Sequence, residues 1–180
     1  GVYDNWVDGE IPIHVPDYIT KKVYRWSPAE TQKNKAMRED ILKFSTDLHF
    51  VVMNIEAFST KKGTDFASKF LLNKRALFAI DESTTIKSPT AARTKNTVRL
   101  AKYAVHRRIL TGSPVTRSPL DLYTQCEFLD PGLLGFSSYY SFRARFAEMI
   151  DRSAGGRTFK QVLGYKNLDE LNTLIQPFSY

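Results

Sequence analysis

Apolar residues along the chain form short continuous runs that alternate with helix-spaced stripes. The β-rich runs lie at 21–26, 49–55, 76–81 and 106–110. Helical spacing of apolar positions predicts helices around Met37 and Ile41 and over residues 64–73 and 90–104. Strands that alternate with helices predict an α/β fold, with a mainly parallel sheet flanked by helices and right-handed crossovers.

Several helix boundaries are marked by capping residues and prolines. Residues 2–13 are amphipathic, and we expect their helix to end at Pro12 and Pro16. Ser27–Glu30 reads Ser-Pro-Ala-Glu, which predicts a helix start with a capping box. The apolar stripe of this predicted helix continues to Phe44. A second start is predicted at Ser118–Asp121.

The last third of the chain changes character and predicts a helical appendage. Tyr139, Phe142, Phe146 and Met149 recur at helical spacing, which indicates a core stripe rather than a surface for stacking bases. Residues 151–158 are polar and glycine-rich, so we expect a flexible exposed loop, followed by a helix over 167–175. We therefore divide the chain into a core lobe, 1–135, and a helical extension, 136–180.

The run at 76–81 ends in two adjacent carboxylates, Asp81 and Glu82. An apolar run this continuous predicts a strand buried on both faces, and ligands of parallel sheets lie at the carboxyl ends of the strands. One carboxylate there can hold Mg²⁺ through water, and the other can position a water that attacks a phosphate. The alternative is a strand that runs into a solvated acidic turn.

A second polar loop, Thr111-Gly112-Ser113-Pro114, follows the next predicted strand. Its hydroxyls can hydrogen-bond, and Gly112 lets the backbone approach a ligand closely. If the two strands are parallel neighbours, both loops lie at one edge of the sheet, where the hydroxyls could sense a γ-phosphate. Taken alone, this sequence is equally typical of a simple turn.

Composition and charge narrow the function classes. The net charge of +7 favours a polyanion as partner. The single cysteine, Cys126, excludes an internal disulfide, favours a reducing compartment and lies on an apolar helix face, which indicates a core residue. The three histidines show no metal-ligand spacing, and neither a signal peptide nor a membrane-length apolar run is present.

In their order along the chain, these motifs resemble the first RecA-like lobe of Swi/Snf-type superfamily-two helicases, which are DNA translocases. Asp81–Thr84 resembles the DEAH-like second motif, and Arg108–Pro114 resembles motif III. The other matching segments are Val51–Glu56, Ile86–Ser88, Leu120–Tyr123, Phe128–Pro131, Gly164–Leu171 and Gln176–Phe178. The resemblance covers nearly the whole chain.

The resemblance implies a motor that couples ATP hydrolysis to movement along double-stranded DNA. Asp81 would bind Mg²⁺ through water, and Glu82 would orient or deprotonate the attacking water. Thr111, Gly112 and Ser113 would contact the nucleotide and couple its state to DNA. Asn54 would meet a DNA phosphate, and Lys87 would touch either DNA or a neighbouring motif. The second RecA-like lobe of the parent chain would be a partner, and no membrane would be.

The sequence also departs from the family pattern. Thr84 replaces the family's histidine, Thr116-Arg117 its Gln-Asn pair, and Met53-Asn54 its Thr-Thr. The phosphate-binding Gly-x-x-x-x-Gly-Lys-Ser/Thr sequence is absent from the chain. We therefore interpret the chain as an interior excerpt, nearly inert alone, of a cytoplasmic, nucleoid or nuclear protein. The compact spacing of the motifs favours a bacterial or phage source.

Two other function classes remain open at this stage. One is a non-catalytic nucleic-acid-binding module, in which the basic helices bind and the carboxylate pair has no role. The other is a helicase of a different superfamily-two branch that acts on RNA or separates strands. A purely structural α/β domain would require the ordered motif set to be coincidental.

Overall fold

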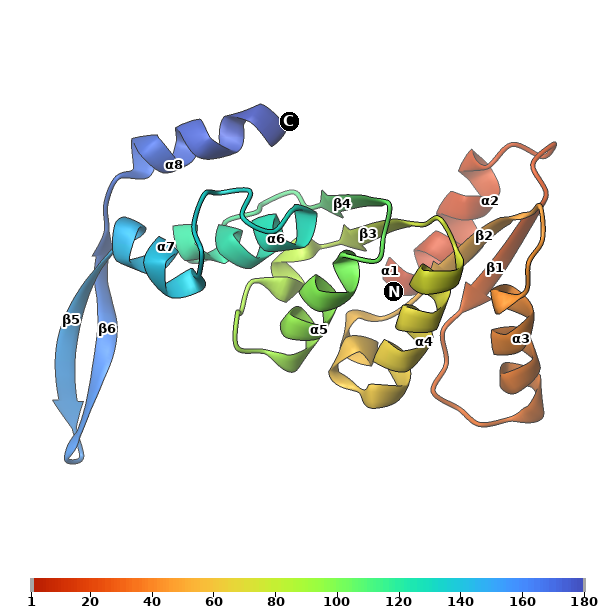
Figure 1. Ribbon diagram of the computed structural model, residues 1–180, viewed down its shortest axis with the longest axis horizontal. Coiled ribbons are helices and arrows are strands. Elements are labelled where there is room, and N and C mark those ends of the chain that lie inside the picture. Colours follow the sequence, from red (N-terminus) through yellow and green to blue (C-terminus); the bar gives the residue numbers. More distant parts are fainter. Residues whose placement is uncertain (1, 180) are drawn as a thin grey trace. The chain divides into compact units, whose positions relative to one another are not determined.

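The computed structural model describes residues 2–179, and it divides the chain into two compact units that meet between Ala76 and Leu77 (Figure 1). We predicted a boundary between residues 135 and 136 instead. The structural boundary lies earlier because each unit contains its own pair of parallel strands and its own buried apolar side chains.

The first unit consists of one parallel strand pair with helices before, between and after its strands. Its elements are α1 (Val2–Asn5), a π-helical segment (Trp6–Glu10), α2 (Ile11–His14), β1 (Lys21–Arg25), α3 (Gln32–Leu42), β2 (Leu48–Val52), a 3₁₀ segment (Ile55–Ser59) and α4 (Lys61–Asn73). β1 and β2 pair in parallel from Lys21 opposite Leu48 to Arg25 opposite Val52. The first helical segment ends at His14, because Val15 precedes Pro16 and takes an extended conformation.

The predicted capping box at Ser27–Glu30 is wrong. α3 begins at Gln32, and its cap is Thr31, whose hydroxyl accepts a hydrogen bond of 3.3 Å from the Asn34 amide. Ser27 instead accepts from the Ala29 amide, also at 3.3 Å, and this stabilises a local turn before the helix.

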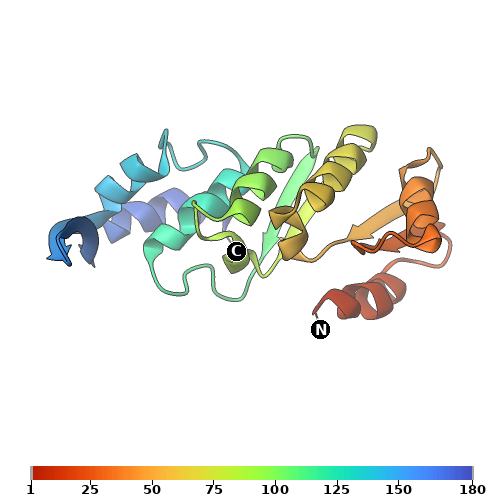
Figure 2. The ribbon, with the colours of Figure 1, turned by 90° about the horizontal axis from the view of Figure 1, so that it is seen from below.

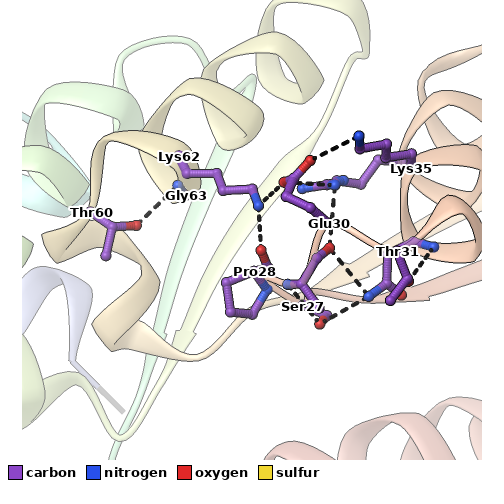
Figure 3. Close-up of polar contacts among 11 residues, drawn as sticks. Ser27, Pro28, Glu30, Thr31, Lys35, Thr60, Lys62 and Gly63 are labelled. Carbon is purple, nitrogen blue, oxygen red and sulfur yellow. Dashed lines mark hydrogen bonds and ion pairs between the residues drawn. The ribbon is translucent and has the colours of Figure 1, made fainter.

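Glu30 has a different role, as an acceptor for three cations (Figure 3). It pairs with Lys35 and Arg38 of α3 and with Lys62 at the start of α4. Lys62 also donates to the carbonyl of Pro28. These contacts join the segment before α3 to α4, which explains why the glutamate does not fold back onto its own helix start.

Aromatic rings form much of the core of the first unit. Trp26 stacks on Phe66 at 4.9 Å between ring centroids, and Tyr24 meets the same ring edge-on at 5.5 Å. Ile41 is buried as predicted. Phe44, which we placed on the same stripe, is 94% exposed, because α3 ends at Leu42 and the stripe does not continue beyond it.

The second unit combines a parallel strand pair, four α-helices and an antiparallel hairpin within residues 77–179 (Figure 2). Its elements are β3 (Leu77–Asp81), α5 (Ala92–Ala101), β4 (His106–Leu110), α6 (Leu122–Leu129), α7 (Tyr139–Phe146), β5 (Ala147–Ala154), β6 (Arg157–Tyr165) and α8 (Leu168–Ile175), with 3₁₀ segments at Ser83–Ile86, Pro119–Asp121 and Gln176–Phe178. Ser118 caps its helical segment as predicted, with a 3.0 Å bond from the Leu120 amide.

β3 is a true strand, but it is not buried on both faces. Ile80 is 5% exposed, whereas Leu77 is 59% exposed. Within the described residues β3 pairs with β4 alone, from Leu77 opposite His106 to Asp81 opposite Leu110. α6 packs against this pair, where the Phe78 and Phe128 rings meet edge-on at 5.0 Å.

The α/β class is therefore confirmed, with two parallel strand pairs and one antiparallel hairpin in the described chain. The core prediction for the aromatic stripe also holds, since Phe142 and Phe146 of α7 are fully buried. Met149 lies on β5 rather than on the helix, because α7 ends at Phe146.

The predicted flexible loop at 151–158 is wrong, and so is the purely helical character of residues 136–180. β5 and β6 form an antiparallel hairpin across this region. Gly155 and Gly156, with φ of +58° and +76°, make the turn between the strands, since positive φ is easily adopted only by glycine.

Candidate functional site

Asp81 and Glu82 lie at the carboxyl end of β3, and both side chains are exposed. The Glu82 amide donates a 3.0 Å hydrogen bond to Asp81 Oδ1. Glu82 adopts a left-handed backbone, φ 52° and ψ 60°, which costs energy for a residue with a side chain. This turn ends the strand and starts the 3₁₀ segment at Ser83, so the two carboxylates project from one edge of the β3–β4 pair.

The second predicted loop lies at the same edge. Since Asp81 is opposite Leu110, Thr111–Ser113 begins directly beside the carboxylates, as the sequence predicted. Thr111 Oγ1 accepts a 3.2 Å bond from the Ser113 amide, and Ser113 Oγ donates to the Val115 carbonyl at 3.0 Å. Gly112 is exposed and has open space on the side where a Cβ would lie.

Gln125 of α6 connects the two loops, and the sequence analysis missed it. Its Oε1 accepts a 2.5 Å bond from the buried Ser83 hydroxyl, and its Nε2 donates to the Pro114 and Asp121 carbonyls, both at 2.8 Å. Gln125 and Ser83 have no exposed surface. The available signal was an amide side chain on the apolar face of a predicted helix, where it must find partners if buried.

Lys87 also joins the two regions. Its ammonium group donates a 2.6 Å bond to Thr116 Oγ1 and lies 3.8 Å from Asp121 Oδ2. Thr116 in turn donates to Asp121 at 2.9 Å. Lys87 therefore contacts a neighbouring motif, and its contact with DNA stays a prediction. It also gives Thr116, one of the departures from the family pattern, a structural partner.

The donor set at this edge fits Mg²⁺ bound together with a nucleotide. Mg²⁺ is commonly held by one or two carboxylates, with phosphate and water supplying the remaining ligands. Asp81 and Glu82 provide exposed carboxylates of that kind. Within residues 2–179 no group of three or more His, Cys, Asp or Glu side chains could hold a metal ion by itself.

Asn54 belongs to the first compact unit, whereas the other predicted site residues belong to the second. It follows β2, and its Oδ1 accepts a 2.9 Å bond from the Glu56 amide, which caps the 3₁₀ segment at Ile55–Ser59. The side chain is exposed, so its amide Nδ2 can still donate to a phosphate.

Cys126 is a core residue, as predicted. It is 3% exposed, and burial raises the pKa of its thiol to about 12. The thiolate is the reactive form, so this cysteine remains protonated and unreactive near neutral pH.

Comparison with known proteins matches residues 2–179 to the SNF2-related domain. The chain belongs to the SNF2-related family. Its relatives include a protein named chromatin-remodeling ATPase INO80 from Eremothecium gossypii, 28% identical over 176 residues, which are 97% of this chain and 12% of the relative. The INO80 protein of Saccharomyces cerevisiae is 27% identical over the same span, 11% of its length. The Swi/Snf-type resemblance inferred from the motifs is thus confirmed.

A relative with a different name matches a smaller part of the chain. A SWI/SNF-related matrix-associated actin-dependent regulator of chromatin subfamily A-like protein 1 homolog from Caenorhabditis elegans is 32% identical over 95 residues, 53% of this chain. This chain spans about an eighth of the curated INO80 and nematode relatives it matches.

Two further expectations concern a membrane, which we did not expect as a partner, and the source of the protein. Among the described residues, no helix is both long and apolar enough to span a membrane. The expected bacterial or phage source is not supported, because the relatives found are eukaryotic.

Proposed function

We propose that this segment is part of the first RecA-like lobe of an ATP-dependent motor that moves along double-stranded DNA. The observation that supports it most directly is the juxtaposition of two loops, Asp81–Glu82 and Thr111–Ser113, at one sheet edge. The family match adds support, since the INO80 relatives are named ATPases.

The carboxylates have distinct roles in this proposal. Asp81 would hold Mg²⁺ through water, and Glu82 would orient the attacking water or accept its proton. Bound Mg²⁺ would neutralise charge that develops on the transferred phosphate. Glu82 stands on a strained backbone whose next residue, Ser83, is bonded to Gln125, so its position is fixed by the protein rather than by the ligand.

The remaining predicted residues would relate nucleotide state to DNA. Thr111, Gly112 and Ser113 would lie near the terminal phosphate, and a shift of their loop would reach Ser83 through Gln125. Asn54 would contact a DNA phosphate, a contact that positions the motor without reading base sequence. Lys87, which donates a hydrogen bond to Thr116, would touch either that neighbouring motif or DNA.

The test is ATP hydrolysis by the longest natural reading frame that contains this segment, with and without double-stranded DNA. We expect DNA to stimulate turnover, and Glu82→Gln to lower it about 100-fold or more while nucleotide binding persists. Glu39→Gln is the matched control, because Glu39 is an exposed glutamate on α3.

Other outcomes would select a different function. DNA binding without turnover, unaffected by Glu82→Gln, would favour the non-catalytic nucleic-acid-binding module. Stimulation by RNA, or strand displacement on a partial duplex, would favour another branch of superfamily two. In every arm the affinity for DNA should fall steeply with salt, because phosphate contacts release counterions.

A further inference from the structure

The β5–β6 hairpin is a structural arm that the proposed motor site does not use. Its base packs on the core of the second unit through Met149 and Val162. Residues 151–161 are all exposed, and the arm extends away from α7 and α8 (Figure 1). Two strands alone are only marginally stable, so we expect an exposed hairpin of this length to be stabilised by a binding partner.

The pairing register assigns the side chains of the arm to two faces. Residues directly opposite each other in an antiparallel pair share a face. One face carries the pairs Met149–Val162, Asp151–Lys160 and Ser153–Thr158, and the other carries Ile150–Gln161, Arg152–Phe159 and Ala154–Arg157.

The first face satisfies its own polar groups. Lys160 Nζ lies 3.5 Å from Asp151 Oδ1, and the Ser153 and Thr158 hydroxyls lie 3.3 Å apart. Toward the base, Met149 and Val162 contribute apolar surface to the core. The charges of this face cancel, so it has no electrostatic preference for an outside partner.

The second face has the opposite character. Arg152 and Arg157 are diagonal neighbours on it, and none of its six residues is acidic. No ion pair to either arginine is formed by any residue from 2 to 179. Like charges at diagonal positions of a strand pair repel each other, and a bound anion would relieve that repulsion. Phe159, directly opposite Arg152, is 50% exposed.

We propose that this face of the hairpin, which we call the arginine face (Arg152, Arg157 and Phe159), binds single-stranded DNA. Guanidinium groups bind phosphate oxygens in a bidentate manner, and an exposed aromatic ring offers a surface on which an unpaired base can stack. A protein partner would have to supply acidic groups around an aromatic pocket. The basic charge of the whole chain, +7, favours the polyanion.

The experiment measures the affinity of the full natural protein for a fluorescent 30-nucleotide oligothymidine, without ATP, over a range of salt concentrations. We expect Arg152→Gln and Arg157→Gln each to weaken binding about threefold to tenfold. Each should also reduce the slope of log affinity against log salt by about 0.7, because one phosphate contact is lost. Phe159→Ala should weaken binding by at least about fivefold and leave that slope unchanged.

Lys160→Gln is the matched control, because it removes one positive charge from the same hairpin on the opposite face. It should change affinity less than twofold. If Lys160→Gln weakens binding as much as the arginine variants, the arginine face has no special role and the proposal fails. It also fails if the arginine variants bind oligothymidine as tightly as the wild type. The same holds if Phe159→Ala leaves the affinity unchanged, which would indicate contacts with the DNA phosphates alone.

Failure of this proposal is distinguishable from failure of the proposed motor. Glu82→Gln should leave oligothymidine affinity unchanged, and the hairpin variants should leave turnover at saturating double-stranded DNA unchanged. Circular dichroism of each variant checks that the overall secondary structure is preserved. A wild-type protein that binds no oligothymidine at low salt would overturn the arginine-face proposal while leaving the ATPase test intact.

Discussion

At the scale of single residues, the most consequential side chain is Gln125. A buried amide is costly unless each of its polar atoms finds a partner. Gln125 meets this requirement with three hydrogen bonds, one to Ser83 and one to each of two backbone carbonyls. Because these partners lie in or beside the two site loops, the hydrogen bonds that satisfy the buried amide also fix the distance between the loops.

We predict that Gln125→Leu destabilises the chain by about 2–3 kcal/mol, since it leaves the Ser83 hydroxyl and two carbonyls without this partner. Gln125→Glu should be at least as damaging, because a carboxylate can accept from Ser83 but cannot donate to the carbonyls. Urea unfolding of residues 1–180 measures both. An exposed control, Gln32→Leu, should change stability little, and a neutral Gln125→Leu would contradict the assigned hydrogen bonds.

At the scale of elements, helix starts depend on contacts that lie outside the helix. α4 is capped by Thr60, whose hydroxyl accepts from the Gly63 amide at 3.1 Å (Figure 3). The same turn lies against the preceding 3₁₀ segment, where a Cβ on Gly63 would approach the Ala57 carbonyl oxygen to 2.1 Å. Only glycine allows the two segments to lie this close without displacing backbone atoms.

We predict that Gly63→Ala destabilises the first unit by about 2–3 kcal/mol, even though alanine favours helices, because the added methyl group must displace the Ala57 backbone. Thermal unfolding of residues 1–180 measures the effect. Ser68→Ala, a change to alanine in the middle of α4, is the control and should be neutral or slightly stabilising. A stabilising Gly63→Ala would show that the helix start can move away from the 3₁₀ segment at little cost.

At the scale of the whole molecule, the chain contains the two carboxylates proposed for ATP hydrolysis but no sequence typical of a phosphate-binding loop. The sequence has no Gly-x-x-x-x-Gly-Lys-Ser/Thr, and the chain spans about an eighth of the INO80 and nematode relatives it matches. Phosphoryl transfer depends on positioning and on neutralising the phosphate charge. Asp81 and Glu82 can supply only part of either.

We therefore predict that residues 1–180 alone hydrolyse ATP no faster than a buffer blank, with or without DNA. The measurement is phosphate release from the purified segment, with its Glu82→Gln variant as the control for contaminating ATPases. Turnover present in the segment and absent in that variant would show that the remaining parts of a nucleotide site are dispensable.

The sequence by itself determined the four parallel strands, the order of the motifs and the sheet edge at which the two site loops meet. Continuous apolar runs followed by Asp81 and Thr111 are local patterns, and parallel pairing then places both loops together. The family could be inferred from the same ordered motifs.

Only the tertiary structure decided features that depend on contacts distant in the sequence. Glu30 does not form the predicted capping box, because it pairs with Arg38 of α3 and Lys62 of α4 instead. Residues 151–158 became a hairpin because β6 supplies partners that a local reading of a glycine-rich stretch does not include. β3 is half-exposed because its burial depends on which elements pack on each of its faces. Gln125 connects the two site loops because Ser83, 42 residues away in the sequence, lies beside it.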